Sequence, residues 1–114
     1  MPPRDETLKY LPLSEATYYI LLALVRPRHG YAVMQMVERL SEEVVTVGPG
    51  TLYGVLASLE KEALIVQIRQ EERRKVYALT PKGKAVLASQ VRRLEVMSRH
   101  GVEILDRLWE EGEE

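Results

Sequence analysis

Hydrophobic residues recur at helical spacing through the first third of the chain. Residues 15–25 form an apolar-rich run that begins after Ser14, a good helix cap, and ends before Pro27. Residues 30–40 place apolar side chains at positions i, i+3, i+4 and i+7, with polar side chains on the opposite face. The pattern predicts a mostly buried first helix followed by an amphipathic second helix.

A third helix is predicted to begin at Gly48-Pro49, because proline is favoured at the first helical position, where its missing N–H costs nothing. Four aliphatic residues at helical spacing between positions 52 and 59 form its inner face. Its outward face carries Thr51, Gly54, Ser58 and Lys61, with Tyr53 near the boundary. Small and polar side chains at the start of a helix allow another molecule to approach closely.

Two short segments with strand character follow. Residues 64–69 and 75–80 are rich in β-branched or aromatic side chains, and a charged segment separates them, which predicts a hairpin. Thr80-Pro81 then supplies a cap and a first-position proline for a last helix. That helix can run to about residue 110, a length of about 45 Å.

The last helix carries a near-heptad apolar stripe that is interrupted by Ser98 and Gly101. A chain of this size buries only about 65% of its unfolded surface, so a helix with such a stripe is expected to pack against a second subunit. The predicted dimer interface consists of Leu87, Val91, Leu94, Met97, Ile104, Leu105, Leu108 and Trp109.

The order of elements is three short helices, a hairpin and a long helix. This order predicts a mainly α fold with a small β-hairpin, the winged helix-turn-helix, in which the third helix enters the major groove of DNA and the hairpin is the wing. We expect residues 1–80 to form a DNA-binding domain and residues 81–114 to form a dimerisation helix with an acidic tail.

The amino-acid composition argues against most catalytic and metal-binding functions. The chain of 114 residues has no cysteine and two isolated histidines, so a disulfide, a thiolate metal site or a histidine-built centre is not expected. No paired carboxylates or Ser/His/Asp cluster indicates an enzyme, and no catalytic residue, metal or cofactor is predicted. The start of the chain has no apolar signal region, and no stretch is long enough to span a membrane, so we expect a cytoplasmic protein.

Charge is distributed unevenly although the net charge is only −1. From Glu103 to the end, six acids stand against one base, so the other 102 residues carry 15 bases and 11 acids. A mildly basic body with an acidic tail is compatible with DNA binding but does not demonstrate it.

Four motifs in a fixed order resemble the PadR family of bacterial transcriptional regulators. They are His-Gly-Tyr at 29–31, Gly-Pro-Gly-Thr-Leu-Tyr at 48–53, Leu-Glu-Lys-Glu-Ala-Leu-Ile at 59–65 and Arg-Lys-Val-Tyr-Ala-Leu-Thr-Pro-Lys-Gly at 74–83. The resemblance implies a homodimeric repressor that binds pseudo-palindromic operator DNA, and many members release DNA when a small aromatic or drug-like ligand binds. Its length resembles the short subgroup with a single C-terminal helix. One departure is Ala63, where the family usually has glycine.

The expected DNA contacts lie on the third helix and the wing. The glycines permit close approach to the phosphates, the hydroxyls can donate to them, and the basic wing residues can contact the backbone. The predicted DNA-binding residues are Gly50, Thr51, Tyr53, Gly54, Ser58, Lys61, Arg73, Arg74 and Lys75.

Several alternatives stay open. Tyr53 can instead pack between helices, and Glu71 and Glu72 at the wing tip would repel the DNA backbone. Trp109 can stack on a flat ligand, with Met97 supplying an adaptable gap, or it can anchor the dimer interface. The rival function is a protein-interaction adaptor that keeps the winged-helix scaffold without binding specific DNA.

Overall fold

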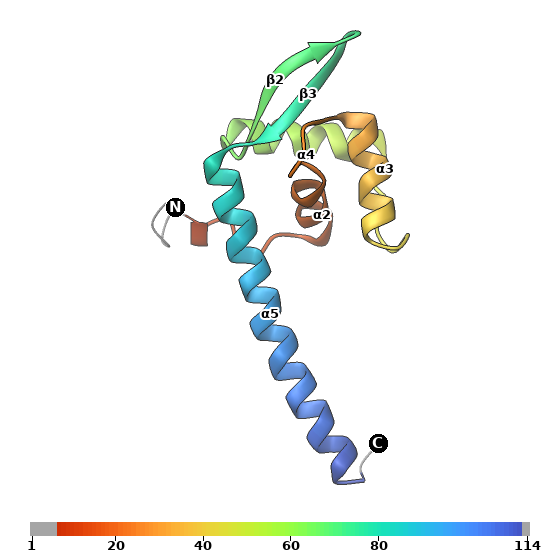
Figure 1. Ribbon diagram of the computed structural model, residues 1–114, viewed down its shortest axis with the longest axis vertical. Coiled ribbons are helices and arrows are strands. Elements are labelled where there is room, and N and C mark those ends of the chain that lie inside the picture. Colours follow the sequence, from red (N-terminus) through yellow and green to blue (C-terminus); the bar gives the residue numbers. More distant parts are fainter. Residues whose placement is uncertain (1–6, 113–114) are drawn as a thin grey trace.

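The computed structural model describes residues 7–112 as three short helices, a small sheet and one long helix (Figure 1). The elements are α2 (Glu15–Ala23), β1 (Arg28–His29), α3 (Gly30–Leu40), α4 (Pro49–Lys61), β2 (Ile65–Glu71), β3 (Arg74–Leu79) and α5 (Pro81–Glu110). The predicted fold class, a winged helix followed by a long C-terminal helix, is confirmed. Residues 1–6 and 113–114, which include the last two acids of the predicted tail, lie outside the described residues.

Local start signals place the helices where the sequence predicts them. The hydroxyl oxygen of Ser14 accepts the Thr17 N–H at 3.1 Å and caps α2. Helix α2 ends at Ala23, two residues before the predicted end, because the chain must turn ahead of Pro27 and enter the extended strand β1. Helix α3 has the predicted bounds, and it buries Val33 and Val37 against the same core.

Helix α4 begins at Pro49, as predicted, and buries Leu52, Leu56 and Leu59. Its other end is closed by two backbone bonds, from the Leu64 N–H to the Leu59 carbonyl at 2.9 Å and from the Ala63 N–H to the Glu60 carbonyl at 3.0 Å. This pattern is a Schellman cap, which places the residue after the cap in the left-handed region. That residue is Ala63, at φ +59°, where a side chain is unfavourable.

Replacing Ala63 with glycine is expected to stabilise the fold. Glycine adopts the left-handed conformation without the Cβ clash, so Ala63→Gly should raise the free energy of unfolding by about 1 kcal/mol. Urea unfolding followed by circular dichroism measures the change. The matched control is Ala57→Gly in the exposed middle of α4, which should lower stability by about 1 kcal/mol. Equal losses in both variants would contradict the account of the cap.

The wing is longer than the sequence predicts. Strands β2 and β3 pair antiparallel from Ile65–Leu79 up to Glu71–Arg74, which leaves only Glu72 and Arg73 in the turn. Both residues have positive φ, 46° and 69°, as a type I′ turn requires. Charged residues are unusual in such a turn, which is why residues 70–74 read as a longer loop in the sequence. The two-residue strand β1, which pairs with β3, was not predicted at all.

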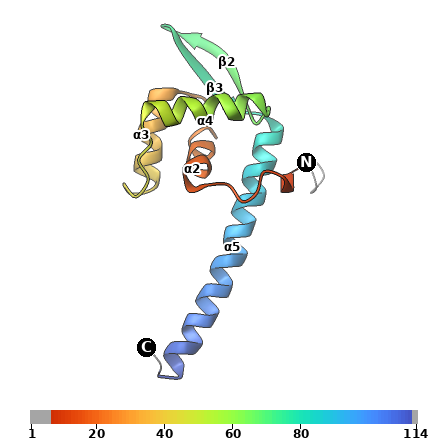
Figure 2. The ribbon, with the colours of Figure 1, turned by 180° about the vertical axis from the view of Figure 1, so that it is seen from behind.

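The first turns of helix α5 are packed in the winged-helix domain, and the rest of the helix extends outside it. Thr80 caps the helix by accepting the Gly83 N–H at 3.0 Å, and the first three turns bury Gly83, Val86 and Gln90 in the domain. Leu87 is only 7% exposed and belongs to the core of its own chain, which corrects its assignment to the subunit seam. Beyond Gln90 the helix projects away from the other elements (Figures 1 and 2).

The segment before α2 lies along α5 (Figure 2). The Leu13 N–H donates to Oε1 of Gln90 at 3.0 Å, and the Ser89 hydroxyl donates to the Thr7 hydroxyl at 3.2 Å. The packed start of α5 therefore extends the winged-helix core past residue 80. The projecting part of α5 takes part in neither of these two hydrogen bonds. No helix among residues 7–112 is long and apolar enough to cross a membrane.

Candidate nucleic-acid interface

The outward face of α4 is flat and open at its start. Gly50 and Gly54 have no atoms within 4 Å of the position where a Cβ would be, and Thr51, Ser58 and Lys61 are exposed. Gly48, the cap residue, offers no side-chain acceptor to the first N–H groups of α4, whereas His29, Thr80 and Ser14 cap their helices with side chains. The free N–H groups and the helix dipole favour an anion at this end.

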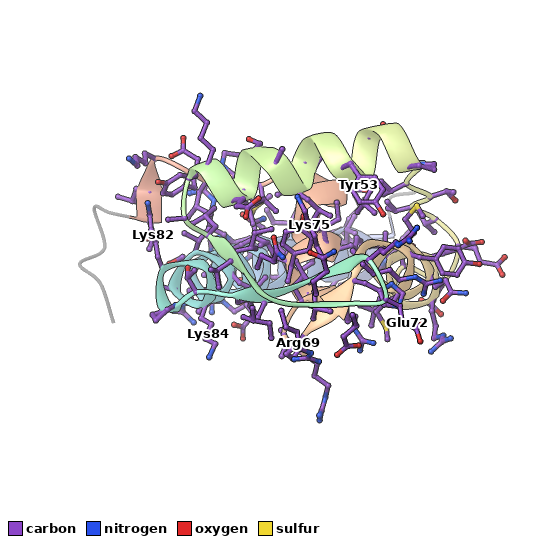
Figure 3. The ribbon with its side chains drawn as sticks, turned by 90° about the horizontal axis from the view of Figure 1, so that it is seen from above. Tyr53, Arg69, Glu72, Lys75, Lys82 and Lys84 are labelled. Carbon is purple, nitrogen blue, oxygen red and sulfur yellow. The ribbon has the colours of Figure 1, made fainter. Side chains whose placement is uncertain are left out.

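The wing lies beside α4 and presents cations toward it. Figure 3 looks down on this surface and places Tyr53 and Lys75 between α4 and the hairpin, whereas Arg69 and Glu72 lie on the far side of the hairpin. Arg69 pairs with Glu71, so the carboxylate of Glu71 is compensated within the wing. The repulsion expected from two acids at the tip is thus reduced to that of Glu72 alone.

An open cleft of about 460 Å³ joins the start of α3, the start of α4 and the wing. Its described lining contains three cations and no carboxylate, so the cleft favours an anionic group. The lining residues are His29, Gly30, Tyr31, Tyr53, Arg73, Arg74, Lys75 and Tyr77. The structure thus brings together four predicted DNA-binding residues, Tyr53, Arg73, Arg74 and Lys75, while the remaining predicted contacts lie outside the cleft on α4.

Tyr53 packs over Gly30. A Cβ on Gly30 would lie 2.6 Å from the Tyr53 hydroxyl oxygen, so a side chain at position 30 would require the Tyr53 ring to move. Tyr53 nevertheless remains 52% exposed. It therefore packs against α3 with one edge and faces solvent with the other, so the packing between helices is observed while the exposed edge stays open to the predicted DNA contact.

Tyr77 forms the floor of the cleft. Burial raises the pKa of its hydroxyl above the ordinary value of 10.0, and the charge of Glu60 and the neighbouring Tyr53 raise that pKa further. The phenol therefore stays neutral and able to donate a hydrogen bond at physiological pH. Tyr77 does not add a negative charge to a cleft that is lined by cations.

His29, Tyr31 and Tyr77 line this surface but are absent from the predicted DNA contacts. In the sequence the His-Gly-Tyr motif contributes only to the family resemblance, and residues 75–80 contribute only to that resemblance and to a predicted hairpin. They meet because Arg28 and His29 pair with Tyr77 and Val76 across the sheet. A two-residue strand has no periodicity that could reveal this pairing beforehand.

The residues predicted for the dimer interface lie along the projecting part of α5, Leu87 excepted. Leu94, Met97, Ile104, Leu105 and Trp109 are exposed, and Val91 and Leu108 are partly buried. Val102, which was not predicted, is exposed on the same helix. Met97 lines an open groove of about 760 Å³ together with Leu8 and Leu11, whereas Trp109 lies about 18 Å farther along the helix. Within one chain these two candidate ligand contacts do not share a pocket.

Among the described residues no cluster of histidine, aspartate or glutamate is suited to hold a metal ion. What the surface offers is a row of hydrogen-bond donors and cations from two adjacent elements. Such an arrangement binds and positions an anionic polymer, and it contains no nucleophile paired with a base.

Comparison with known proteins agrees with this geometry. Residues 20–89 match the family described as transcriptional regulator PadR-like. The chain is 34% identical over 86 residues to a 37.1 kDa protein from transposon TN4556 of Streptomyces fradiae, a match that covers 75% of this chain and 24% of that protein. It is 37% identical over 67 residues to a transcriptional regulator of Mycobacterium tuberculosis, covering 56% of this chain and 63% of that one.

The fold is similar to that of a PadR family transcription regulator from Clostridium difficile. The two are 22% identical, with a TM-score of 0.66 over 81% of this chain and 99% of that chain. The present chain spans about a quarter of the length of the Streptomyces fradiae protein and just under two thirds of the length of the Mycobacterium tuberculosis regulator. The match over residues 20–89 extends from α2 through the wing into the packed start of α5. The chain therefore belongs to the PadR-like family of transcriptional regulators.

Proposed function

We propose that this chain is a homodimeric repressor that binds a pseudo-palindromic operator through α4 and the wing. The observation that carries the proposal is that the open face of α4 adjoins a cleft lined by cations. Tyr53 and Lys75 of this cleft lie between α4 and the hairpin (Figure 3). A major groove about 12 Å wide admits a helix, and side chains as small as those of Gly50, Thr51 and Gly54 let its backbone come near the phosphates. Arg73, Arg74 and Lys75 would bind the flanking backbone.

The projecting part of α5 supports the dimer. An isolated helix of about twenty residues is marginally stable in water, and here it exposes six large apolar side chains between residues 94 and 109. Burial of that stripe against a second copy would stabilise both helices. Ser98 and Gly101 lie on the stripe, and their small size would let two helices approach closely. The second copy would then hold two α4 helices at the spacing of successive major grooves, about 34 Å.

A ligand that releases DNA would act on this same seam. The groove that Met97 lines is bordered by α5 and the segment before α2, so an apolar molecule seated there would change how α5 meets its partner. We place Trp109 in the seam as an anchor, where it also supplies a flat face for an aromatic ligand. A shift in seam packing would move the two α4 helices out of register with DNA.

Selection of duplexes from a randomised pool tests the proposal. The purified protein should enrich a pseudo-palindrome, and its affinity should fall on the order of 1000-fold or more between 50 and 200 mM salt if six to ten phosphates are contacted. A folded dimer that enriches no sequence would contradict specific DNA binding and favour the protein-interaction adaptor.

The double variant Thr51→Ala with Arg74→Ala locates the binding surface. It removes one donor from α4 and one cation from the wing, so affinity for the selected duplex should fall about 10- to 100-fold while the dimer persists in size-exclusion chromatography. The control is Arg39→Ala, which removes an exposed cation from the end of α3 farthest from the wing. Unchanged affinity in the double variant would place the DNA on another face.

A further inference from the structure

The corner between α3 and the wing contains a histidine that faces two hydrogen-bond donors. Nδ1 of His29 lies 3.3 Å from the Ala32 backbone nitrogen, whose N–H it accepts as the cap of α3. Nε2 of the same ring lies 3.3 Å from Nη1 of Arg74, on β3. A single imidazole therefore connects the helix start to the wing.

The two contacts cannot both be hydrogen bonds to a neutral ring. A neutral imidazole has one acceptor nitrogen and one N–H, whereas a backbone amide and a guanidinium only donate. If Nδ1 keeps its lone pair for the helix cap, Nε2 must carry the proton. Nε2–H and the Arg74 N–H are then two donors directed toward the same place with no acceptor between them.

The surroundings of this pair fit an anion. His29 and Arg74 lie in the cleft of about 460 Å³, whose described lining adds the cations Arg73 and Lys75 and no carboxylate. Tyr31 and Tyr53 supply hydroxyl groups from two helices in the same cleft. An oxygen atom placed there would accept from both donors and remove the conflict, while the cap of α3 stays intact.

We propose that His29 and Arg74 form a subsite for one phosphate of the duplex backbone, with a phosphate oxygen accepting from His29 Nε2–H and from the Arg74 guanidinium. This inference rests on the proposed function, and it adds a DNA contact, His29, that lies outside α4 and the wing. Because His29 precedes α3 and Arg74 lies on β3, the bound phosphate joins these two elements. The wing is thereby fixed relative to the helices at the moment DNA binds.

Two substitutions separate the proposed role of His29 Nε2–H as a hydrogen-bond donor from the role of Nδ1 as the cap of α3. In His29→Asn the amide oxygen still caps α3, since asparagine is among the best caps, but the short side chain does not reach the position of Nε2. In His29→Gln the amide nitrogen occupies the position of Nε2, whereas glutamine is a poor cap. The two variants therefore test the two roles in opposite directions.

A phosphate subsite predicts that His29→Asn loses duplex binding and His29→Gln retains it. Affinity for the selected duplex should fall about tenfold in His29→Asn, because one hydrogen bond to the phosphate is lost. The slope of log affinity against log salt should stay at the wild-type value in His29→Asn, since Arg74 still neutralises the phosphate, and should decrease by about 0.9 in Arg74→Ala. His29→Gln should match the wild type in affinity but melt at a lower temperature. Adding Arg74→Ala to His29→Asn should cost less than the two single losses combined, because both side chains serve one phosphate. Wild-type binding by His29→Asn would overturn the proposal.

A titration with inorganic phosphate decides the matter if no duplex is bound. At constant ionic strength, the NMR signals of the His29 ring and the Arg74 side chain should shift saturably in the wild type and in His29→Gln, but not in His29→Asn. Saturable shifts without any duplex binding would keep the anion subsite and reject DNA as its source. Duplex binding that is unaffected by His29→Asn would keep the DNA proposal and reject the subsite. Absence of both duplex binding and phosphate shifts would reject both.

Discussion

Gly83→Ala is expected to destabilise the fold by several kcal/mol. A Cβ at position 83 would lie 2.0 Å from the backbone oxygen of Leu64, so one of the two backbones has to move. That same oxygen accepts the Thr80 N–H at 3.1 Å, and the Thr80 hydroxyl donates to the Ala63 carbonyl. Movement would therefore disturb the junction between the end of α4 and the start of α5 at several hydrogen bonds together. Overpacking combined with an unsatisfied buried group should cost about 3–5 kcal/mol, a large part of the 5–15 kcal/mol typical of a domain.

Chemical denaturation of Gly83→Ala beside Gly54→Ala gives the matched comparison. Both variants replace a helical glycine by alanine, but Gly54 has open space around it. Gly54→Ala should therefore gain up to about 1 kcal/mol from helix propensity, whereas Gly83→Ala unfolds at a much lower urea concentration. Similar midpoints for the two variants would mean that α5 can shift away from Leu64 without loss.

Features that depend on a few neighbouring residues were predictable from the sequence. Helix α4 starts at Pro49 and α5 at Pro81, as expected, because a cap residue followed by proline acts locally and needs no partner elsewhere in the chain. The family resemblance, not local chemistry, marks Ala63 as a departure, and its positive φ shows that the backbone keeps the shape that glycine would favour. Local chemistry thus sets the frame of the winged helix.

Features that depend on distant pairing were not predictable. Strand β1 is extended only because Arg28 and His29 find Tyr77 and Val76 on β3. The cleft follows from this pairing, since it brings the start of α3 to the base of the wing. No pattern within residues 28–31 distinguishes a strand from a loop, so the contacts of His29 with Ala32 and Arg74 became visible only in the structure.

The apolar stripe of α5 shows a further limit of sequence patterns. Leu87 and Leu105 occupy equivalent positions in the pattern, yet Leu87 is buried in its own chain and Leu105 is 51% exposed. Burial within a chain and burial between chains demand the same hydrophobic spacing, so periodicity alone cannot separate them. The two parts of α5 differ in what lies alongside them: the first turns pack against α2 and the segment before it, that segment reaches no farther than the groove lined by Met97, and Leu105 lies beyond it.

In the proposed dimer, Leu105→Glu is expected to give monomers that do not bind the proposed operator. In the isolated chain the substitution is tolerated, because position 105 is half exposed and glutamate is a good helix former. In a dimer that buries the stripe, a carboxylate from each copy would lose its hydration next to the other, at a cost of several kcal/mol. A cost of about 3 kcal/mol or more raises the dimer dissociation constant by more than about 100-fold. A monomer contacts only one half-site, so affinity for the palindrome should fall at least as steeply.

Sedimentation equilibrium and duplex binding of Leu105→Glu should be compared with those of His100→Glu. The control adds the same charge to the same helix at an exposed position off the apolar stripe, so it isolates the effect of the seam from that of net charge. We expect His100→Glu to remain dimeric and to bind the operator. We expect Leu105→Glu to lose both properties while a helical circular dichroism spectrum shows that the winged-helix domain is still folded. If Leu105→Glu stayed dimeric, the contact between copies would lie on another surface, and the spacing of the two α4 helices would have to be set there instead of by α5.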